Sequence, residues 1–343
     1  MSKQIDVAIL THAGGAHIGA YITALAAAPE VRKVYLADPS GRFVGQAKQG
    51  LGKKFAESGK DARRLLTKYK PTMALVSMEA AVAPAAIDVA LDENCHVFAE
   101  KPACVRAEDF AQLVQKAKAK NRYLMLALAN RLNPETQAAK TLVSQGAIGK
   151  VYGLEMHLIA DQTRLTSKSY QKNWFAQKAR AGGGHLTWLG IHWLDLAMYI
   201  TGSKIQQVSG FHGVVGGQPI DVEDSAAVTM KFDNNTFGTL TSGYYLDRGY
   251  HTHLRIWGSN GWLEVDPIGS EKLVWYSRKQ KGSAGKMMKF TKSTQPRGYS
   301  PFVRAAVRAC AGLEKPPISA DESLLALKTV YAFYDASGKG KKV

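Results

Sequence analysis

Cysteine is scarce in this chain, and long apolar runs are absent. The 343 residues include three cysteines, Cys95, Cys104 and Cys310. They have neither metal-ligand nor redox spacing, and their odd number argues against a disulfide framework. No apolar stretch reaches membrane-spanning length, and the start, MSKQIDVAIL, lacks the charged head and apolar run of a signal peptide. These absences predict a cytoplasmic protein with no membrane contact, no disulfides and no metal site.

Acidic residues are in the minority. Lys and Arg number 45 against 28 Asp and Glu, so the formal net charge is +17. Basic residues crowd 116–122, 272–297 and the tail GKGKKV. Such a surface attracts nucleic acid or anionic ligands, but no nucleic-acid-binding motif accompanies it. We interpret most of this charge as solvated surface, with help for an anionic ligand as an alternative and no specific nucleic-acid partner.

Strand and helix patterns alternate over the first 125 or so residues. Buried-strand patterns occur at 5–10, 31–38, 72–78, 96–100 and 122–129. Helical patterns occur at 18–27, 63–69, 83–91 and 107–120. This alternation predicts an α/β domain with a doubly wound parallel sheet. Since the chain is too long for one ordinary core, we expect two domains, at 1–125 and 126–343.

Strands dominate the second half, after a linking helix at 134–145. Candidate strands occupy 151–160, 225–232, 236–245, 252–258 and 262–266, with hairpin turns at 233–235 and 259–261. Consecutive hairpins predict a mostly antiparallel sheet. Two helices, at about 300–312 and 320–336, close the chain, and the last is a candidate to pack back on the first domain. The basic segment 279–298 is expected to be a mobile loop or ragged hairpin.

A glycine-containing turn joins the first strand to the first helix. Gly14, Ala16 and Gly19 have the spacing of a dinucleotide-binding loop. The amides and dipole of the following helix suit a pyrophosphate. The candidate cofactor contacts in this turn are Gly14, Gly15, Ala16, His17 and Ile18. The alternative is a turn that only packs helix on strand.

Asp38 lies at the end of the second strand, where an acid binds a ribose diol. An acid there favours NAD, because it repels the extra phosphate of NADP. Arg42, four residues on, would partly reverse that preference. The sequence therefore predicts NAD as cofactor, with NADP as an alternative.

The tripeptide Glu100-Lys101-Pro102 follows the strand at 96–99. Ligands gather at the carboxyl ends of the strands in such sheets. A lysine there would hydrogen-bond a substrate oxygen and stabilise charge on it, with Glu100 as its positioning partner. The alternative is a surface ion pair ahead of a proline turn.

A second candidate site lies in GGGHLTWLGIHWLD, residues 182–195. Bare glycine backbone at the head of a helix lets another molecule approach closely. His192 and Asp195 are three residues apart and share one helix side. The imidazole exchanges a proton near neutral pH, and the carboxylate would orient it. The alternative is a buried helix with one satisfied histidine.

These stretches together resemble the glucose–fructose oxidoreductase / inositol dehydrogenase / rhizopine-catabolism (Gfo/Idh/MocA) family over nearly the whole chain. The resemblance is carried by EKP at 100–102, NRLNP at 130–134, GAIGKV at 146–151, the triple glycine followed by GxHxxD, and VEDSAA at 222–227. It implies an N-terminal Rossmann domain and a C-terminal α/β domain with a large open sheet that forms a homodimer or homotetramer. It also implies a nicotinamide cofactor and a carbohydrate, polyol or related alcohol as substrate.

The resemblance also implies roles for single residues. Lys101 matches the family's catalytic lysine, and His192 matches its acid/base histidine. Glu79 falls near the loop that contacts the nicotinamide side, and the peptide before Pro102 is commonly cis in relatives.

The chain departs from the family pattern at Trp188, where many relatives have an aspartate. One helical turn is expected between Trp188 and His192, so that both face the same pocket. An indole stacks well on a sugar ring but has no acid/base group. His192 is therefore the expected proton acceptor, and Asp195 an orienting or packing residue. Arg131, Trp174, Tyr244 and Tyr245 are further candidates for the substrate pocket, although core packing or an ion pair explains each of them equally well.

The favoured hypothesis is an NAD(P)-dependent dehydrogenase or reductase acting on CH–OH groups. His192 would take the hydroxyl proton while hydride leaves the carbon for the nicotinamide. Three other hypotheses stay open. They are a glycoside-cleaving enzyme that uses bound NAD in a transient oxidation, a non-catalytic NAD-binding protein, and nucleic-acid binding through the basic surface.

Overall fold

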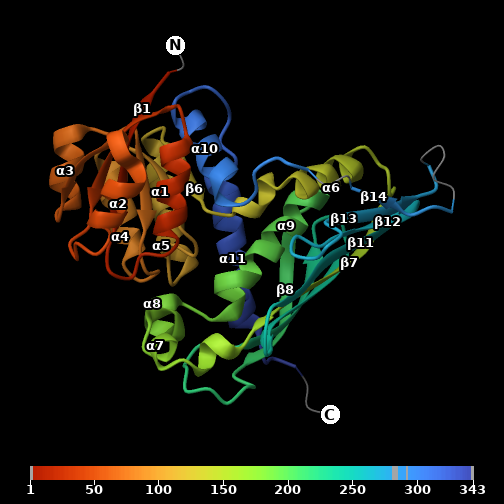
Figure 1. Ribbon diagram of the computed structural model, residues 1–343. Helices are drawn as coiled ribbons and strands as arrows, with labels where there is room; N and C mark the ends of the chain where they lie inside the picture. The colour runs from red at the N-terminus through yellow and green to blue at the C-terminus, as the bar shows by residue number, and fades with distance from the viewer. Residues whose placement is uncertain (1–2, 280–284, 291–292, 341–343) are drawn as a thin grey trace. The chain divides into compact units, whose positions relative to one another are not determined.

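The computed structural model describes residues 3–279, 285–290 and 293–340 (Figure 1). Contacts divide the chain into two compact units. The first comprises 1–132, 179–182 and 296–325, and the second comprises 133–178, 183–295 and 326–343. Each unit is therefore assembled from stretches that are separated along the chain.

A parallel sheet forms the centre of the first unit. Within the described residues it has six strands in the order β3-β2-β1-β4-β5-β6. The strands are β1 (Ile5–Thr11), β2 (Val31–Ala37), β3 (Phe55–Gly59), β4 (Met73–Ser77), β5 (His96–Ala99) and β6 (Leu124–Leu126). β1 and β4 are buried along their whole length, as strands covered on both faces are. The predicted doubly wound parallel sheet is confirmed.

Helices connect these strands and cover the sheet (Figure 1). They are α1 (Ile18–Ala27), α2 (Val44–Leu51), α3 (Ala62–Tyr69), α4 (Ala83–Asp92) and α5 (Ala107–Ala119). Near the end of the chain, α10 (Tyr299–Cys310) packs on α1. The sequence prediction missed α2 and β3, because VGQAKQGL is largely polar and FAESG has no apolar run. It also made β6 too long, because a 3₁₀ turn begins at Ala129.

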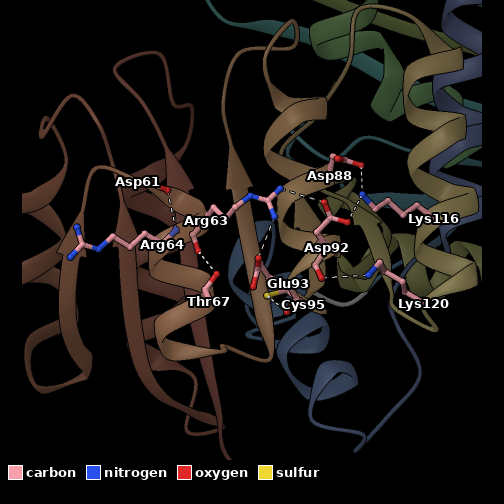
Figure 2. Close-up of polar contacts among 10 residues, drawn as sticks. All are labelled: Asp61, Arg63, Arg64, Thr67, Asp88, Asp92, Glu93, Cys95, Lys116 and Lys120. Carbon is pink, nitrogen blue, oxygen red and sulfur yellow. Dashed lines mark hydrogen bonds and ion pairs between the residues drawn. The ribbon is translucent and has the colours of Figure 1, made fainter.

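Ion pairs tie α3, α4 and α5 together (Figure 2). Lys116 on α5 lies 2.6 Å from Asp88 and 2.7 Å from Asp92, both on α4. Arg63 on α3 lies 3.4 Å from Asp92 and 3.3 Å from Glu93. Acids at the end of α4 therefore balance part of the basic cluster at 116–122.

A larger, mixed sheet forms the second unit. Within the described residues it has eight strands in the order β14-β13-β12-β11-β7-β10-β9-β8. β7 and β10 pair in parallel, and the other neighbours are antiparallel. The strands are β7 (Val151–Asp161), β8 (Ile205–Gly213), β9 (Ser225–Phe232), β10 (Phe237–Leu246), β11 (Tyr250–Gly258), β12 (Gly261–Val265), β13 (Leu273–Ser277) and β14 (Met288–Lys289). The predicted mostly antiparallel sheet and its two hairpin turns are confirmed.

One face of this sheet is buried and the other is more exposed. In β7, Leu154, Met156 and Leu158 are buried, whereas the alternating Glu155 and His157 are partly exposed. The buried side packs against α9 (Ile191–Thr201), which in turn contacts α6 (Pro134–Ser144). The alternation of a half-buried strand therefore holds from 153 to 158 and ends at Ile159 and Ala160, which are both buried.

Three strands of this unit were missed, namely β8, β13 and β14. β8 is polar, with the sequence IQQVSGFHG, and lies at the sheet edge. β14 falls in the predicted loop or ragged hairpin at 279–298, of which 280–284 and 291–292 lie outside the described residues. The predicted closing helices are confirmed as α10 and α11 (Ala320–Ala336). Among the helices of the described chain, none has the length and apolar character needed to cross a bilayer.

Candidate active site

The turn between β1 and α1 packs tightly against β4. The Thr11 hydroxyl donates to the Ser77 carbonyl oxygen at 2.8 Å, and the Ser77 hydroxyl donates to the Ala16 carbonyl oxygen at 2.6 Å. A Cβ atom on Gly15 would lie 2.1 Å from Thr11 Oγ1 and 3.0 Å from the Ser77 carbonyl oxygen. Close packing therefore requires glycine at position 15.

Three amides of this turn have acceptors inside the protein. The Gly14 amide donates to His12 Nδ1 at 2.6 Å, and the Gly15 amide donates to the His12 carbonyl oxygen at 2.9 Å. The Ala16 amide donates to Ser77 Oγ at 3.1 Å. Helix α1 follows, with no side-chain cap from His17 and no acidic residue in its first turn. The start of α1, near Ile18, is thus the element that best suits a pyrophosphate.

Asp38 and Arg42 both lie in the loop after β2. Asp38 is 2 % exposed, and it accepts from the Ser40 amide at 3.0 Å and the Phe43 amide at 2.9 Å. A carboxylate has lone pairs for further donors, so this arrangement still suits a ribose diol. Arg42 Nη1 donates to the Ala13 carbonyl oxygen at 2.7 Å, which places its guanidinium at the glycine-containing turn.

Lys101 and Glu100 lie directly after β5, and both are 2 % exposed. Lys101 Nζ is 3.9 Å from Glu100 Oε1. Glu100 Oε2 accepts from the Tyr21 hydroxyl and lies 3.2 Å from His17 Nδ1. Burial, and then the charge of Glu100, raises the pKa of Tyr21, which keeps its hydroxyl a donor. The burial of the pair rules out a surface ion pair, and an anchored carboxylate beside a lysine suits stabilisation of a ligand oxygen.

The peptide bond between Lys101 and Pro102 is cis, as the family resemblance implies. This bond and the buried pair stand at the carboxyl end of β5. Ligands bind at that edge in doubly wound sheets. The candidate lysine therefore has the position that the sequence predicts.

Two other predicted residues form ion pairs within the first unit. Arg180 donates to Glu79 Oε2, and the Arg180 carbonyl oxygen accepts from the Ala81 amide at 3.0 Å. Arg131 Nη1 donates to Glu322 Oε1 at 2.7 Å. Burial favours a higher pKa for Glu322, but Arg131 and the bonds from Ser319 hold that pKa below its usual range. Both Glu79 and Arg131 thus have clear structural partners.

Two of the three glycines at 182–184, Gly183 and Gly184, lie in the second unit and are explained by packing. A Cβ atom on Gly184 would lie 1.9 Å from the Glu223 carbonyl oxygen. A Cβ atom on Gly183 would lie 2.3 Å from both Thr187 Oγ1 and the Tyr334 hydroxyl oxygen. The space that we expected to admit another molecule at these two glycines is therefore filled by the protein itself.

The Glu223 side chain caps the start of the helical segment that carries His192. Its carboxylate accepts from the Gly184 amide at 2.6 Å, the Leu186 amide at 2.9 Å and the Tyr334 hydroxyl at 2.8 Å. Burial raises the pKa of Glu223, and these hydrogen bonds offset part of that rise. Glu223 was not predicted as a functional residue, although it lies in the motif VEDSAA. The sequence feature that could have identified it is an acid placed between Val222 and a run of small residues.

A π-helical turn, Leu186–Gly190, leads into α9. His192 lies in the first turn of α9, and Asp195 is 1 % exposed. Trp188 lies inside the π turn, so the helical turn between Trp188 and His192 is partly π-helical rather than α-helical throughout. A π turn has more residues than an α turn and changes which side chains share a face. Such turns occur frequently at functional sites.

Aromatic side chains cluster around Trp188. Its ring centroid lies 4.5 Å from that of Phe175 and 5.5 Å from that of Trp174. Trp174 is 2 % exposed and Tyr244 is 5 % exposed, so both pack in the core. Tyr245 is 43 % exposed, and its hydroxyl accepts from Ser225 Oγ at 2.7 Å. Trp188 is partly exposed, so it is the better candidate for stacking on a ligand.

Across 3–279, 285–290 and 293–340, no group of three His, Cys, Asp or Glu side chains is placed to bind a metal ion. Lys101 of the first unit and His192 of the second remain the candidate catalytic residues that the sequence predicts. A lysine stabilises charge, and a histidine moves a proton.

Two sequence profiles of one family match most of the chain. The profile described as "Oxidoreductase family, NAD-binding Rossmann fold" matches residues 13–128. The profile described as "GFO/IDH/MocA C-terminal domain" matches residues 136–264. The two matches lie in the parts of the chain that form the parallel and the mixed sheet.

Individual relatives agree with the family that the two profiles identify. Myo-inositol 2-dehydrogenase of Thermotoga maritima is 24 % identical over 241 residues, which are 69 % of each chain. D-glucoside 3-dehydrogenase of Escherichia coli K12 is 28 % identical over 175 residues, so the chain spans about half of that relative, 48 %. The structure of GenD2 from gentamicin A biosynthesis, in complex with NAD, superposes with a TM-score of 0.83 at 21 % identity and covers 100 % of this chain and 97 % of GenD2. This last likeness shows the shared fold.

Proposed function

Because the chain belongs to the Gfo/Idh/MocA family of NAD-binding oxidoreductases, we propose that it transfers a hydride between a nicotinamide cofactor and a hydroxyl or keto carbon of a sugar, polyol or sugar derivative. The observation that carries the proposal is Lys101, a buried cation at the carboxyl end of β5 beside the anchored Glu100. Relatives named as inositol and glucoside dehydrogenases support the substrate class.

The first unit offers features that suit the cofactor. The start of α1 presents the positive end of a helix dipole, and Gly15 lets the turn pack closely on β4. Asp38 supports a preference for NAD, because its carboxylate repels the extra phosphate of NADP. Arg42 is the one group in this loop that would weaken the preference. When bound, the nicotinamide accepts or returns the hydride.

The proposed roles divide between two side chains. Lys101 donates a hydrogen bond to the substrate oxygen and stabilises the negative charge that develops on it. His192 accepts the hydroxyl proton during oxidation and returns it during reduction. Asp195 orients His192. Trp188 has no group that exchanges a proton, so it supports binding rather than proton transfer.

The first experiment is a fluorescence titration of the purified protein with NADH and with NADPH, after a check for cofactor retained through purification. Tighter binding of NADH supports the role of Asp38, and a sugar and polyol panel then tests turnover. Retained NAD without net turnover would favour the glycoside-cleaving alternative. Failure of a folded sample to bind either cofactor would overturn the proposal.

We also propose that the exposed face of the mixed sheet joins two copies of this chain, as a homodimer or as part of a homotetramer. Phe237 is 65 % exposed and Trp257 is 37 % exposed. Both pair with Gly153, one from each side, so they share the face opposite to the buried Leu154. Sedimentation of the wild type as a dimer or tetramer, and of a Phe237→Arg/Trp257→Arg variant as a monomer, would support this. A monomeric wild type at micromolar concentration would overturn it.

A cytoplasmic location stays a prediction.

A further inference from the structure

Arg164 is a partly buried cation that forms no ion pair with an acid among the described residues. It lies in the 3₁₀ turn Thr163–Thr166, directly after β7. Its Nη2 donates to the Tyr250 hydroxyl at 2.9 Å, and its guanidinium carbon lies 5.3 Å from the centroid of the Tyr244 ring. The acid nearest in sequence, Asp161, accepts from the amide and hydroxyl of Thr163, and these bonds, followed by the charges of Arg164 and Arg248, hold its pKa below the usual range.

Three tyrosines take the place of an acidic partner. Burial raises the pKa of Tyr244 and of Tyr170, so both hydroxyls are neutral at physiological pH. Neutral rings and hydroxyls interact with a guanidinium but do not cancel its charge. A partly desolvated cation gains most from an anion that it binds through two parallel hydrogen bonds. The surroundings of Arg164 therefore suit an anion that comes from outside the chain.

An aromatic row links this cation to the segment that carries His192. The Tyr170 ring stacks on Phe175 with centroids 6.2 Å apart, and Phe175 lies 4.5 Å from Trp188. Trp188 belongs to the π turn that runs into α9. Leu189 of the same turn packs against the cluster that contains Tyr244. These contacts all lie within the second unit, and Tyr170, Phe175 and Trp188 along the row are each partly exposed.

We propose that Arg164, with Tyr170, Tyr244 and Tyr250 around it, binds the carboxylate of an acidic sugar whose ring lies along Phe175 and Trp188. This inference rests on the proposed function and narrows its substrate class from sugars and polyols in general to sugar acids. A carboxylate matches the planar fork of a guanidinium, whereas aromatic faces suit the C–H face of a sugar ring. Substrate selection therefore depends on a charge remote from the reacting carbon.

Direct binding tests the proposal without relying on turnover. Calorimetry on NAD-saturated protein at low salt compares glucuronate with glucose, galacturonate with galactose, and gluconate with glucitol. At least one acid is expected to bind about tenfold or more tightly than its neutral counterpart, and Arg164→Met is expected to remove that difference while neutral sugars bind as before. Arg164→Lys is expected to restore part of it, because the charge returns without the fork.

A matched control and a folding check accompany these variants. Lys168→Met removes an exposed cation four residues away and is expected to leave the acid-to-neutral ratio unchanged. Thermal melting establishes that each variant is folded. The proposal is overturned if no acid outbinds its neutral counterpart, if the ratio survives Arg164→Met, or if the matching sugar phosphates bind more tightly than the acids.

Kinetics then separates this proposal from the proposed function. Turnover of neutral sugars alone, with no acidic sugar bound or turned over by the wild type, would overturn the acidic-sugar site and leave the oxidoreductase intact. Arg164-dependent binding of acids without any nicotinamide turnover would support the site and overturn the proposed function.

Discussion

The lysines of α5 and Arg164 carry the same charge in opposite surroundings. Figure 2 shows Lys116 beside Asp88 and Asp92, and Lys118 lies 2.6 Å from Asp321. Arg164 lies among tyrosines instead. The lysine charges are balanced by ion pairs within the protein, so they tie helices together, whereas Arg164 forms no ion pair among the described residues. The net charge of +17 therefore says less about ligands than the partners of each cation do.

Lys101 sharpens this comparison, because it lies near an acid and is nevertheless proposed to act on substrate. We expect Lys101→Met to lower kcat by about 10²- to 10³-fold, since it removes a donor aimed at developing charge. NADH affinity should change by no more than a few-fold, as fluorescence titration measures. Near-normal turnover would remove Lys101 from the mechanism.

Glu223 differs from Lys101 in charge and in partners. It is a buried carboxylate without a cationic partner among the described residues. In Glu223→Gln the side-chain amide faces the backbone amides of Gly184 or Leu186, so one donor loses its acceptor. We expect about 1–3 kcal/mol of lost stability and a fall of about tenfold or more in kcat, because the segment that carries His192 shifts. Tyr334→Phe, which removes one donor only, should have a smaller effect. An unchanged pH profile of kcat in Glu223→Gln would make Glu223 purely structural.

The pKa of His185 depends on its burial and, second, on the charge of Arg164. Burial, and then Arg164, lowers the pKa of His185 to about 3, while the unfolded value is near 6.5. The folded state thus favours neutral imidazole, so its contribution is fully present above pH 6.5 and is lost as the pH falls towards 3. Denaturant titrations should show about 1–2 kcal/mol lost between pH 7 and 5 from this residue, and His185→Gln should remove that part.

His96 also contributes to the loss of stability as the pH falls. Burial lowers the pKa of His96 to about 4, so it adds its own acid sensitivity in the first unit. The wild type and His185→Gln both retain His96, so their difference isolates His185. An identical pH dependence in the two proteins would contradict the assignment.

Lys116→Met should have the smallest effect. The pair with Asp88 and Asp92 lies at the surface, where such contacts contribute less than about 1 kcal/mol. Chemical denaturation should show that small loss, and kcat and KM should not change. A change in KM would mean that the α5 lysines also serve a ligand, which would erase the difference from Arg164.

Most of the first unit was predictable from the sequence, because its buried strands are short apolar runs. The apolar runs MALVS and HVFA predict β4 and β5, and Lys101 lies two residues after the end of β5. Polar β3 and β8 were missed, because edge strands need no apolar run. Arg164 was missed because its tyrosines come from three separate segments, at 170, 244 and 250. The π turn was also beyond reach, because its residues are compatible with an ordinary α-helix.

The packing of Glu223 against Gly184 has a consequence for how such chains diverge. The two positions are 39 residues apart, yet neither can change freely, because the two stretches are in direct contact. Any side chain at 184 would strike the backbone at 223, and a lost carboxylate would strip acceptors from the amides of Gly184 and Leu186. Sequence change is therefore restricted at each position by its own contact, at 184 by the backbone of residue 223 and at 223 by the amides from which its carboxylate accepts.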